Sequence, residues 1–147
     1  GLGDVYKRQA EDVGNADPQA LTVAVSAAQA VERLGMPEAR IPLAQAAIYV
    51  ACAPKSNAAY MAINEAMDWV AGHKSEPIPP YLQDASYRGA KNFGHGIGYQ
   101  YAHDYLNHYV KQQYLPSELE GRVFYRPTDN GYEEKIQEYF RKIQENS

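Results

Sequence analysis

The sequence predicts an all-α fold, and three observations support that class. Apolar residues recur at helical spacing over several stretches, residues that start and stop helices flank those stretches, and strand patterns are nearly absent. The 147 residues, 45% of them apolar, have the size and composition of one globular domain. We therefore expect three consecutive helices, a tyrosine-rich irregular segment and a C-terminal amphipathic helix.

The first predicted helix lies between Asp17 and Gly35. Asp17 is expected to cap its start, and Pro18 to take the first helical position, where a missing N–H group has no cost. Leu21 and Val25 recur at helical spacing, and Gly35 supplies the stop. Because this helix is also rich in alanine, we expect a neighbouring helix to approach it closely.

The second predicted helix lies within residues 38–53 and ends before Pro54. It is apolar nearly all round, which is typical of a helix buried on more than one side, as a central element or in a subunit interface. Six positions on the first two helices are the candidates for core or oligomer interface: Leu21, Val25, Ile41, Ala47, Ile48 and Val50.

The third predicted helix begins after Ser56, a favourable N-cap residue, and ends at Gly72. Residues 75–84 contain three prolines and are expected to form a linker, and residues 85–96 a short helix.

The segment Gly96–Pro127 is rich in turns and in tyrosine, a residue suited to core edges and protein interfaces. We expect one short helical turn at residues 115–121 and an extended stretch at residues 123–127, because a residue before proline avoids the helical region. The last predicted helix lies within residues 128–146. Its expected inner face carries Tyr132, Ile136 and Tyr139 or Phe140.

Residues 1–9, "GLGDVYKRQ", show no helical period and no cap. We expect them to be a non-native or disordered leader. Residues 10–147 are expected to form a single helical domain.

The composition limits the function classes. A net charge of −4 argues against a chain that by itself binds a nucleic-acid backbone, which normally needs a basic surface. The single cysteine, Cys52, is expected to be a small buried apolar residue and allows no internal disulfide, which fits a reducing cytosol. No apolar run approaches the roughly 18 residues of a membrane span.

Three of the four histidines, His95, His103 and His108, lie in "GHGIGYQYAHDYLNHY". Zinc sites prefer closely spaced ligand pairs, which this stretch lacks, so a structural role is favoured. A metal-dependent enzyme built on His95, His103 and Asp104 is the weaker hypothesis. The GxGxG pattern over Gly94–Gly98 has neither the preceding strand nor the lysine of a phosphate loop, and it predicts turns with positive φ.

Lys55, Ser56 and Asn57 stand at the start of the third helix, where free N–H groups favour an anion, although a plain corner between helices is the favoured interpretation. Tyr99 and Tyr101 lie among scattered basic residues, a combination that can bind single strands. The candidate DNA or partner contacts are Lys55, Arg88, Lys91, Lys111 and Arg126.

Four phrases in order carry a resemblance to a known family: "AEDVGNADPQAL", "VACAPKSNAAY", "GYQYAHD" and "QQYLPSELEGRVFYRPTDNGYEEKI". With them, the chain resembles the C-terminal region of the replication-associated recombination protein A family (MgsA/RarA), AAA+ ATPases related to clamp loaders. The residues of these motifs are Asp12, Asn15, Asp17, Pro18, Pro54, Lys55, Ser56, Asn57, Tyr99, Tyr101, His103, Asp104, Tyr125 and Pro127.

The resemblance implies a full-length protein with an N-terminal ATPase module that binds ATP and Mg and acts on DNA at stalled replication forks. It implies a collar-like C-terminal domain that assembles a homotetramer, with DNA and replication proteins as partners of the full-length protein. The implied location is the bacterial cytoplasm, in association with the nucleoid. Residues 10–147 would begin inside the collar and hold no cofactor, no metal and no catalytic residue.

One stretch departs from the family pattern, and the residues that depart from it are Gln83, Asp84 and Gly89. No DNA contact is therefore carried over to it. The residues and the resemblance together favour an oligomerisation domain, and the alternative is a DNA- or partner-protein-binding module of the same ATPase.

Overall fold

The computed structural model describes residues 2–73, 78–83, 86, 88, 90–93 and 95–145. This part of the chain contains five α-helices and no strand, which confirms the all-α prediction. The chain divides into two compact units. Unit 1 comprises Gly1–Asp68 and Phe124–Tyr139, and unit 2 comprises Trp69–Val123 and Phe140–Ser147. That residues 10–147 form one domain stays a prediction.

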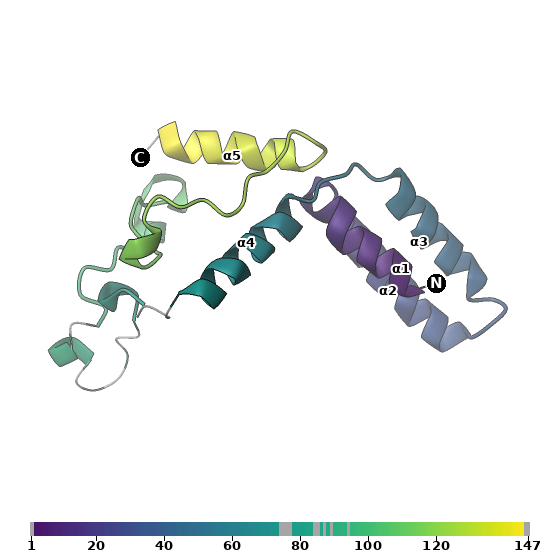
Figure 1. Cartoon of the computed structure of the whole chain (residues 1–147), viewed down its shortest axis with the longest axis horizontal. Coiled ribbons are helices and arrows are strands. Elements are labelled where there is room, and N and C mark those ends of the chain that lie inside the picture. The colour runs from purple at the N-terminus through teal and green to yellow at the C-terminus, as the bar shows by residue number, and fades with distance from the viewer. Residues whose placement is uncertain are drawn as a thin grey trace. The chain divides into compact units, whose positions relative to one another are not determined.

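Unit 1 contains α1 (Leu2–Arg8), α2 (Gln19–Leu34) and α3 (Arg40–Cys52). Figure 1 shows α2 and α3 side by side as an antiparallel hairpin, with α1 packed along them. The core of this group is small and consists of Val13, Ala20, Val50 and Ala53, with Val5 half-buried against it. Alanine and valine dominate this core, so the helices lie close together.

The start of α2 is fixed by Asp17, as predicted. Its carboxylate accepts a hydrogen bond from the Gln19 N–H group at 3.0 Å and another from the Tyr49 hydroxyl of α3 at 2.8 Å. The hydrogen bond to Asp17 raises the pKa of the Tyr49 hydroxyl. The helix stops at Gly35, whose N–H group donates to the Val31 carbonyl. Asp17 thus caps one helix and links it to the next.

The buried face of α2 is lined by alanine. Its buried residues are Ala20, Ala24, Ala27 and Ala28. Leu21 and Val25 are 50% and 38% exposed, so the expectation that they belong to the core of this chain is wrong, and their role in an interface stays a prediction.

The helices α4 (Ala58–Gly72) and α5 (Glu133–Glu145) lie where the sequence predicts them. The Ser56 hydroxyl accepts a hydrogen bond from the Ala58 N–H group at 3.1 Å, which confirms the predicted cap of α4. The expected inner face of α5 is not uniformly buried, because Tyr132 and Tyr139 are about half exposed.

Unit 2 is largely irregular, as predicted. Five short 3₁₀-helical segments occur in its described part: Pro80–Leu82, Ala90–Phe93, Ala102–Asp104, Leu106–His108 and Ser117–Leu119. Side chains hold the segment together: the Tyr81 hydroxyl donates to the Gln113 carbonyl, and Gln112 pairs with the backbone of Gln100.

The glycines Gly96 and Gly98 have φ of 70° and 87°, which confirms the predicted turns, whereas Gly94 lies outside the described residues. The predicted linker over residues 75–84 and the predicted short helix over residues 85–96 lie only partly within the described part of the chain.

Two further sequence expectations fail. Residues 1–9 were expected to show no helix, but α1 occupies Leu2–Arg8 and Gln9 is buried, because Val5 finds apolar contacts that the local sequence does not reveal. Whether these residues are native stays a prediction. Cys52 is exposed at the last position of α3 rather than buried.

In the described part of the chain, no helix has the length and apolar character needed to cross a membrane.

Candidate functional site

Three segments that are distant in sequence meet in unit 1, and together they form what we call the polar junction: residues 12–17, 54–57 and 125–133. Backbone hydrogen bonds join them, from the Ser56 N–H group to the Asp12 carbonyl and from the Tyr132 N–H group to the Ala16 carbonyl, both at 2.8 Å. The Asn130 side chain adds a bond of 3.0 Å to the Lys55 carbonyl. Each segment belongs to a different phrase of the family resemblance.

The centre of the polar junction is the carboxylate of Glu133, which has no exposed surface. One oxygen accepts hydrogen bonds from the Thr128 N–H group and the Thr128 hydroxyl, both at 2.7 Å. The other accepts one of 2.9 Å from the Tyr125 hydroxyl. The Tyr125 hydroxyl in turn accepts a bond of 3.2 Å from the Asn15 side chain.

This arrangement decides the charge of Glu133. Burial alone would raise the pKa of the carboxyl, but hydrogen bonds from Thr128, Ser56 and Tyr125 favour the ionised form and hold its pKa below the ordinary value. Burial raises the pKa of Tyr125, so its hydroxyl keeps the proton that it donates. The junction therefore contains a buried carboxylate whose hydrogen-bonding capacity is met from within the protein.

Close packing around Gly131 brings the third segment against the first two. Gly131 has φ of 57°, and a Cβ atom there would overlap the Ala16 carbonyl oxygen and lie 2.7 Å from Cγ of Pro54. Position 131 thus requires glycine for two reasons: the backbone conformation is left-handed, and there is no space for a side chain.

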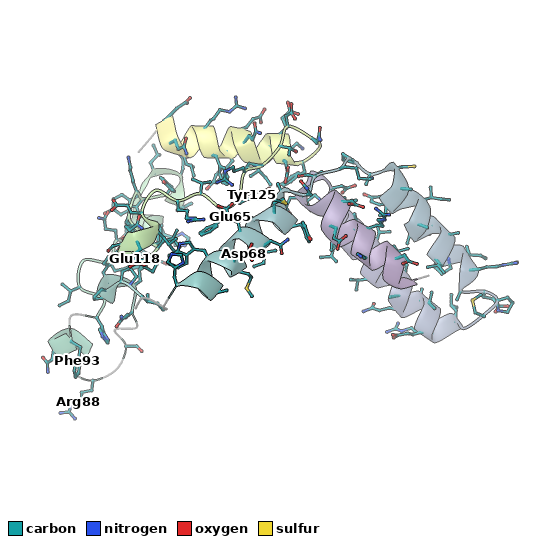
Figure 2. The ribbon with its side chains drawn as sticks, in the orientation of Figure 1. Glu65, Asp68, Arg88, Phe93, Glu118 and Tyr125 are labelled. Atoms are coloured by element: carbon teal, nitrogen blue, oxygen red, sulfur yellow. The ribbon has the colours of Figure 1, made fainter. Side chains whose placement is uncertain are left out.

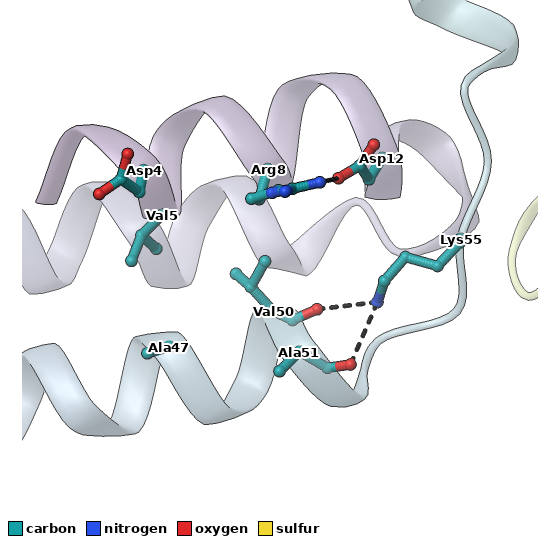
Figure 3. A pocket seen from close by; sticks show the side chains of 8 residues that line it. All are labelled: Asp4, Val5, Arg8, Asp12, Ala47, Val50, Ala51 and Lys55. Carbon is teal, nitrogen blue, oxygen red and sulfur yellow. Dashed lines mark hydrogen bonds and ion pairs between the residues drawn. The ribbon is translucent and has the colours of Figure 1, made fainter. Parts of the chain in front are cut away.

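Lys55 belongs to the junction but points towards α3. Its ammonium group donates to the carbonyl oxygens of Val50 at 2.9 Å and Ala51 at 3.3 Å (Figure 3), and also to that of Ala53. These carbonyls lie at the C-terminal end of α3, where a cation is favoured by the helix dipole. The position of its three N–H donors gives Lys55 a structural role, whereas contact with DNA stays a prediction.

Two hollows border these residues. The one in Figure 3, of about 370 Å³, lies between α1 and α3, where Arg8 and Asp12 form an ion pair of 2.9 Å. The other is an open hollow of about 510 Å³ beside the N-terminus of α4, lined by Asp12, Lys55, Ser56, Asn57, Thr128 and Asn130. Its polar groups are mostly engaged in hydrogen bonds and ion pairs within the protein.

The remaining candidate DNA contacts are divided between the two units. Arg126 forms an ion pair of 3.1 Å with Glu65 in unit 1. Arg88 and Lys111 are exposed in unit 2, where Figure 2 shows Arg88 in the same region as Phe93, and the side chain of Lys91 lies outside the described residues.

The family-motif residues of unit 2 are exposed rather than buried. Tyr99 and Tyr101 are 49% and 55% exposed. The ring of His103 lies 5.0 Å from that of Tyr101 and 5.0 Å from that of His108. Among the residues that can be described, no group of three or more His, Cys, Asp or Glu side chains is arranged to hold a metal ion.

The six candidate core or interface positions divide into two groups. Val50 is 5% exposed and belongs to the core. Ile41 and Ile48 on α3 are 66% and 65% exposed, and Ala47 is exposed as well. For these side chains an interface stays a prediction.

Glu133 is not among the residues that the sequence predicts for a site, because a charged residue in the first turn of an amphipathic helix is expected to face solvent. The sequence signal that points to a role for Glu133 is the turn at residues 128–130, which directly precedes α5. Asn15 and Tyr125 were singled out as motif residues, but only the structure shows that they bind each other.

The fold and the polar junction define a class of protein. It is an all-α domain in which the motifs quoted above bind one another and hold distant segments of the chain together. Residues 6–144 match the family described as the C-terminal domain of MgsA AAA+ ATPases, and the chain belongs to that family.

The chain is similar to three proteins named replication-associated recombination protein A. That of Bacillus subtilis is 44% identical over 134 residues, which cover 90% of this chain and 32% of the relative. That of Coxiella burnetii is 44% identical over 145 residues (96% and 33%), and that of Escherichia coli 42% over 129 residues (87% and 29%). The chain thus spans about a third of the length of these relatives.

Proposed function

We propose that this chain is the self-assembly domain of a replication-associated AAA+ ATPase and that it forms a homotetramer. The ATPase chemistry, with ATP and Mg, belongs to a separate module of the same protein, and this domain contributes no catalytic residue. The full-length protein acts on DNA and with replication proteins, in the bacterial cytoplasm and near the nucleoid. The names of the relatives and the family membership support this placement.

One observation carries the proposal: on α2 and α3 the buried residues are nearly all alanine, whereas several large aliphatic residues are exposed. The buried side chains are mainly alanine, whereas Leu21, Ile41 and Ile48 are 50%, 66% and 65% exposed. Leucine and isoleucine are among the residues that folded chains most often bury. Exposed apolar surface of this kind marks a protein–protein contact.

The test is the molar mass in solution, measured by light scattering after size exclusion over a series of concentrations. We expect a stable mass of four chains. A monomer at every concentration would overturn the proposal.

A second function, binding of single-stranded DNA, is supported by the aromatic cluster of unit 2. Tyr101, His103 and His108 form a chain of ring contacts, and Tyr101 is 55% exposed. Exposed rings next to basic residues stack on bases. Fluorescence anisotropy with a labelled oligonucleotide tests this function. It predicts binding that weakens as salt rises from about 50 to 200 mM, and no binding at the low salt concentration would discard it.

A further inference from the structure

We propose that α3 makes a direct contact with a second copy of the chain, by packing antiparallel against the same helix of that copy. The inference rests on the self-assembly proposed above. It adds the surface that is used and the direction in which the two helices run.

The proposed contact surface is the outer face of α3, opposite the buried Ala46. It carries Ile41, Ala44, Ile48 and Ala51, which follow one another at intervals of three or four residues and so share one side of the helix. Both isoleucines are about two-thirds exposed, and both alanines are exposed. The face is therefore an exposed apolar strip, and Ala51 at its end also lines the hollow between α1 and α3.

The order of residues on this face fits a copy of itself that runs the other way. Along α3 the order is isoleucine, alanine, isoleucine, alanine, so the reversed helix presents alanine wherever the first presents isoleucine. With a two-fold axis at the level of Ala46, Ile48 faces the partner's Ala44 and Ile41 faces the partner's Ala51. Such reciprocal pairing is what a two-fold interface requires, and large side chains opposite small ones allow close packing.

The charge pattern supports the second copy and the antiparallel direction. Arg40 is the only charged residue in Arg40–Cys52. Parallel helices would place the two copies of Arg40 side by side, whereas antiparallel helices separate them by about 18 Å along the axis. A nucleic acid is a poor occupant of this face, because it would need several basic side chains there.

Cysteine cross-linking tests both the surface and the direction. In the antiparallel contact the two copies of residue 44 lie about 6 Å apart along the axis, and the two copies of Cys52 about 18 Å apart. We expect a short bis-maleimide to convert the Ala44→Cys, Cys52→Ser chain into covalent dimers and to leave the chain with its native Cys52 uncoupled. Efficient coupling through native Cys52, or none through residue 44, would overturn the inference.

A charge substitution gives an independent readout. Ile48→Glu is expected to reduce the molar mass to half or less while the far-ultraviolet circular dichroism stays unchanged. The matched control is Ile63→Glu on α4, where the residue is 57% exposed, and it should keep the mass. An unchanged mass for Ile48→Glu would overturn the α3 contact and leave the proposed self-assembly intact. A wild-type chain that is monomeric throughout would overturn both.

Discussion

The Tyr125 hydroxyl donates a hydrogen bond of 2.9 Å to the carboxylate of Glu133, a side chain with no exposed surface. Because Asn15 binds the same hydroxyl, a residue near the start of the chain and the first residue of α5 are joined through one tyrosine. A buried charge is tolerated only when hydrogen bonds replace the water that it loses. The polar junction meets this condition, and its strength can be measured by removing one group at a time.

The first prediction concerns the charge of Glu133. Glu133→Gln is expected to lower the free energy of unfolding by about 2 kcal/mol, because a donor that faces the carboxylate loses its acceptor inside the protein. Urea denaturation followed by circular dichroism at neutral pH measures the change. The neighbouring, exposed Glu134 supplies the control, since Glu134→Gln should change stability by less than about 0.5 kcal/mol. Equal effects of the two substitutions would mean that the buried hydrogen bonds contribute nothing.

The second prediction is the pH dependence that follows from the lowered pKa of Glu133. The unfolded carboxyl takes up a proton near its ordinary pKa of 4.5, whereas the folded one stays ionised to lower pH. Protons therefore favour the unfolded state as the pH falls below about 4.5, and the contribution of Glu133 is fully present above that value. The stability difference between wild type and Glu133→Gln should be constant near neutrality and shrink in acid.

Parallel urea titrations of both chains between pH 7 and pH 3 check this prediction, because the effects of the other carboxyls cancel in the difference. A difference that grew in acid would contradict the direction of the pKa shift.

The third prediction concerns space at Gly131. Gly131→Ala is expected to cost about 3 kcal/mol or more, because the new Cβ overlaps the Ala16 carbonyl and a left-handed backbone disfavours any side chain. Gly121→Ala is the matched control: φ is 73° there, but a Cβ meets nothing within 4 Å. It should cost about 1 kcal/mol. Thermal unfolding of the two variants separates the overlap from the backbone strain, and similar losses would show that the overlap is relieved by a small shift.

The sequence predicts the elements whose signals are local. Helices α2 and α4 begin after Asp17 and Ser56, because a side-chain oxygen binds an N–H group only a few residues away. The turns at Gly96 and Gly98 are predicted for the same reason, since positive φ is a property of single residues.

The burial of each helix face is not a local property. Two sets of apolar residues on α2 recur at helical spacing. One set begins at Ala20 and the other at Leu21, one position later, so the spacing alone does not show which set is buried. Hydropathy favours the larger side chains, but the close approach of α3 selects the alanines. Glu133 is hard to predict for a related reason. Thr128 and Tyr125 are near it in sequence, but the Ser56 hydroxyl that also stabilises its charge comes from a distant segment of the chain.

The last prediction separates two roles of Lys55. Lys55→Met is expected to destabilise the chain by about 1 kcal/mol, because its ammonium group binds carbonyl oxygens at the end of α3. It should leave any affinity for single-stranded DNA unchanged, because those carbonyls already occupy its donors. Lys111→Met, at an exposed position in unit 2, should do the reverse and weaken salt-sensitive binding without loss of stability. Unfolding curves and anisotropy titrations of both variants distinguish the roles. An equal loss of DNA affinity in the two would show that Lys55 leaves the end of α3 to bind phosphate.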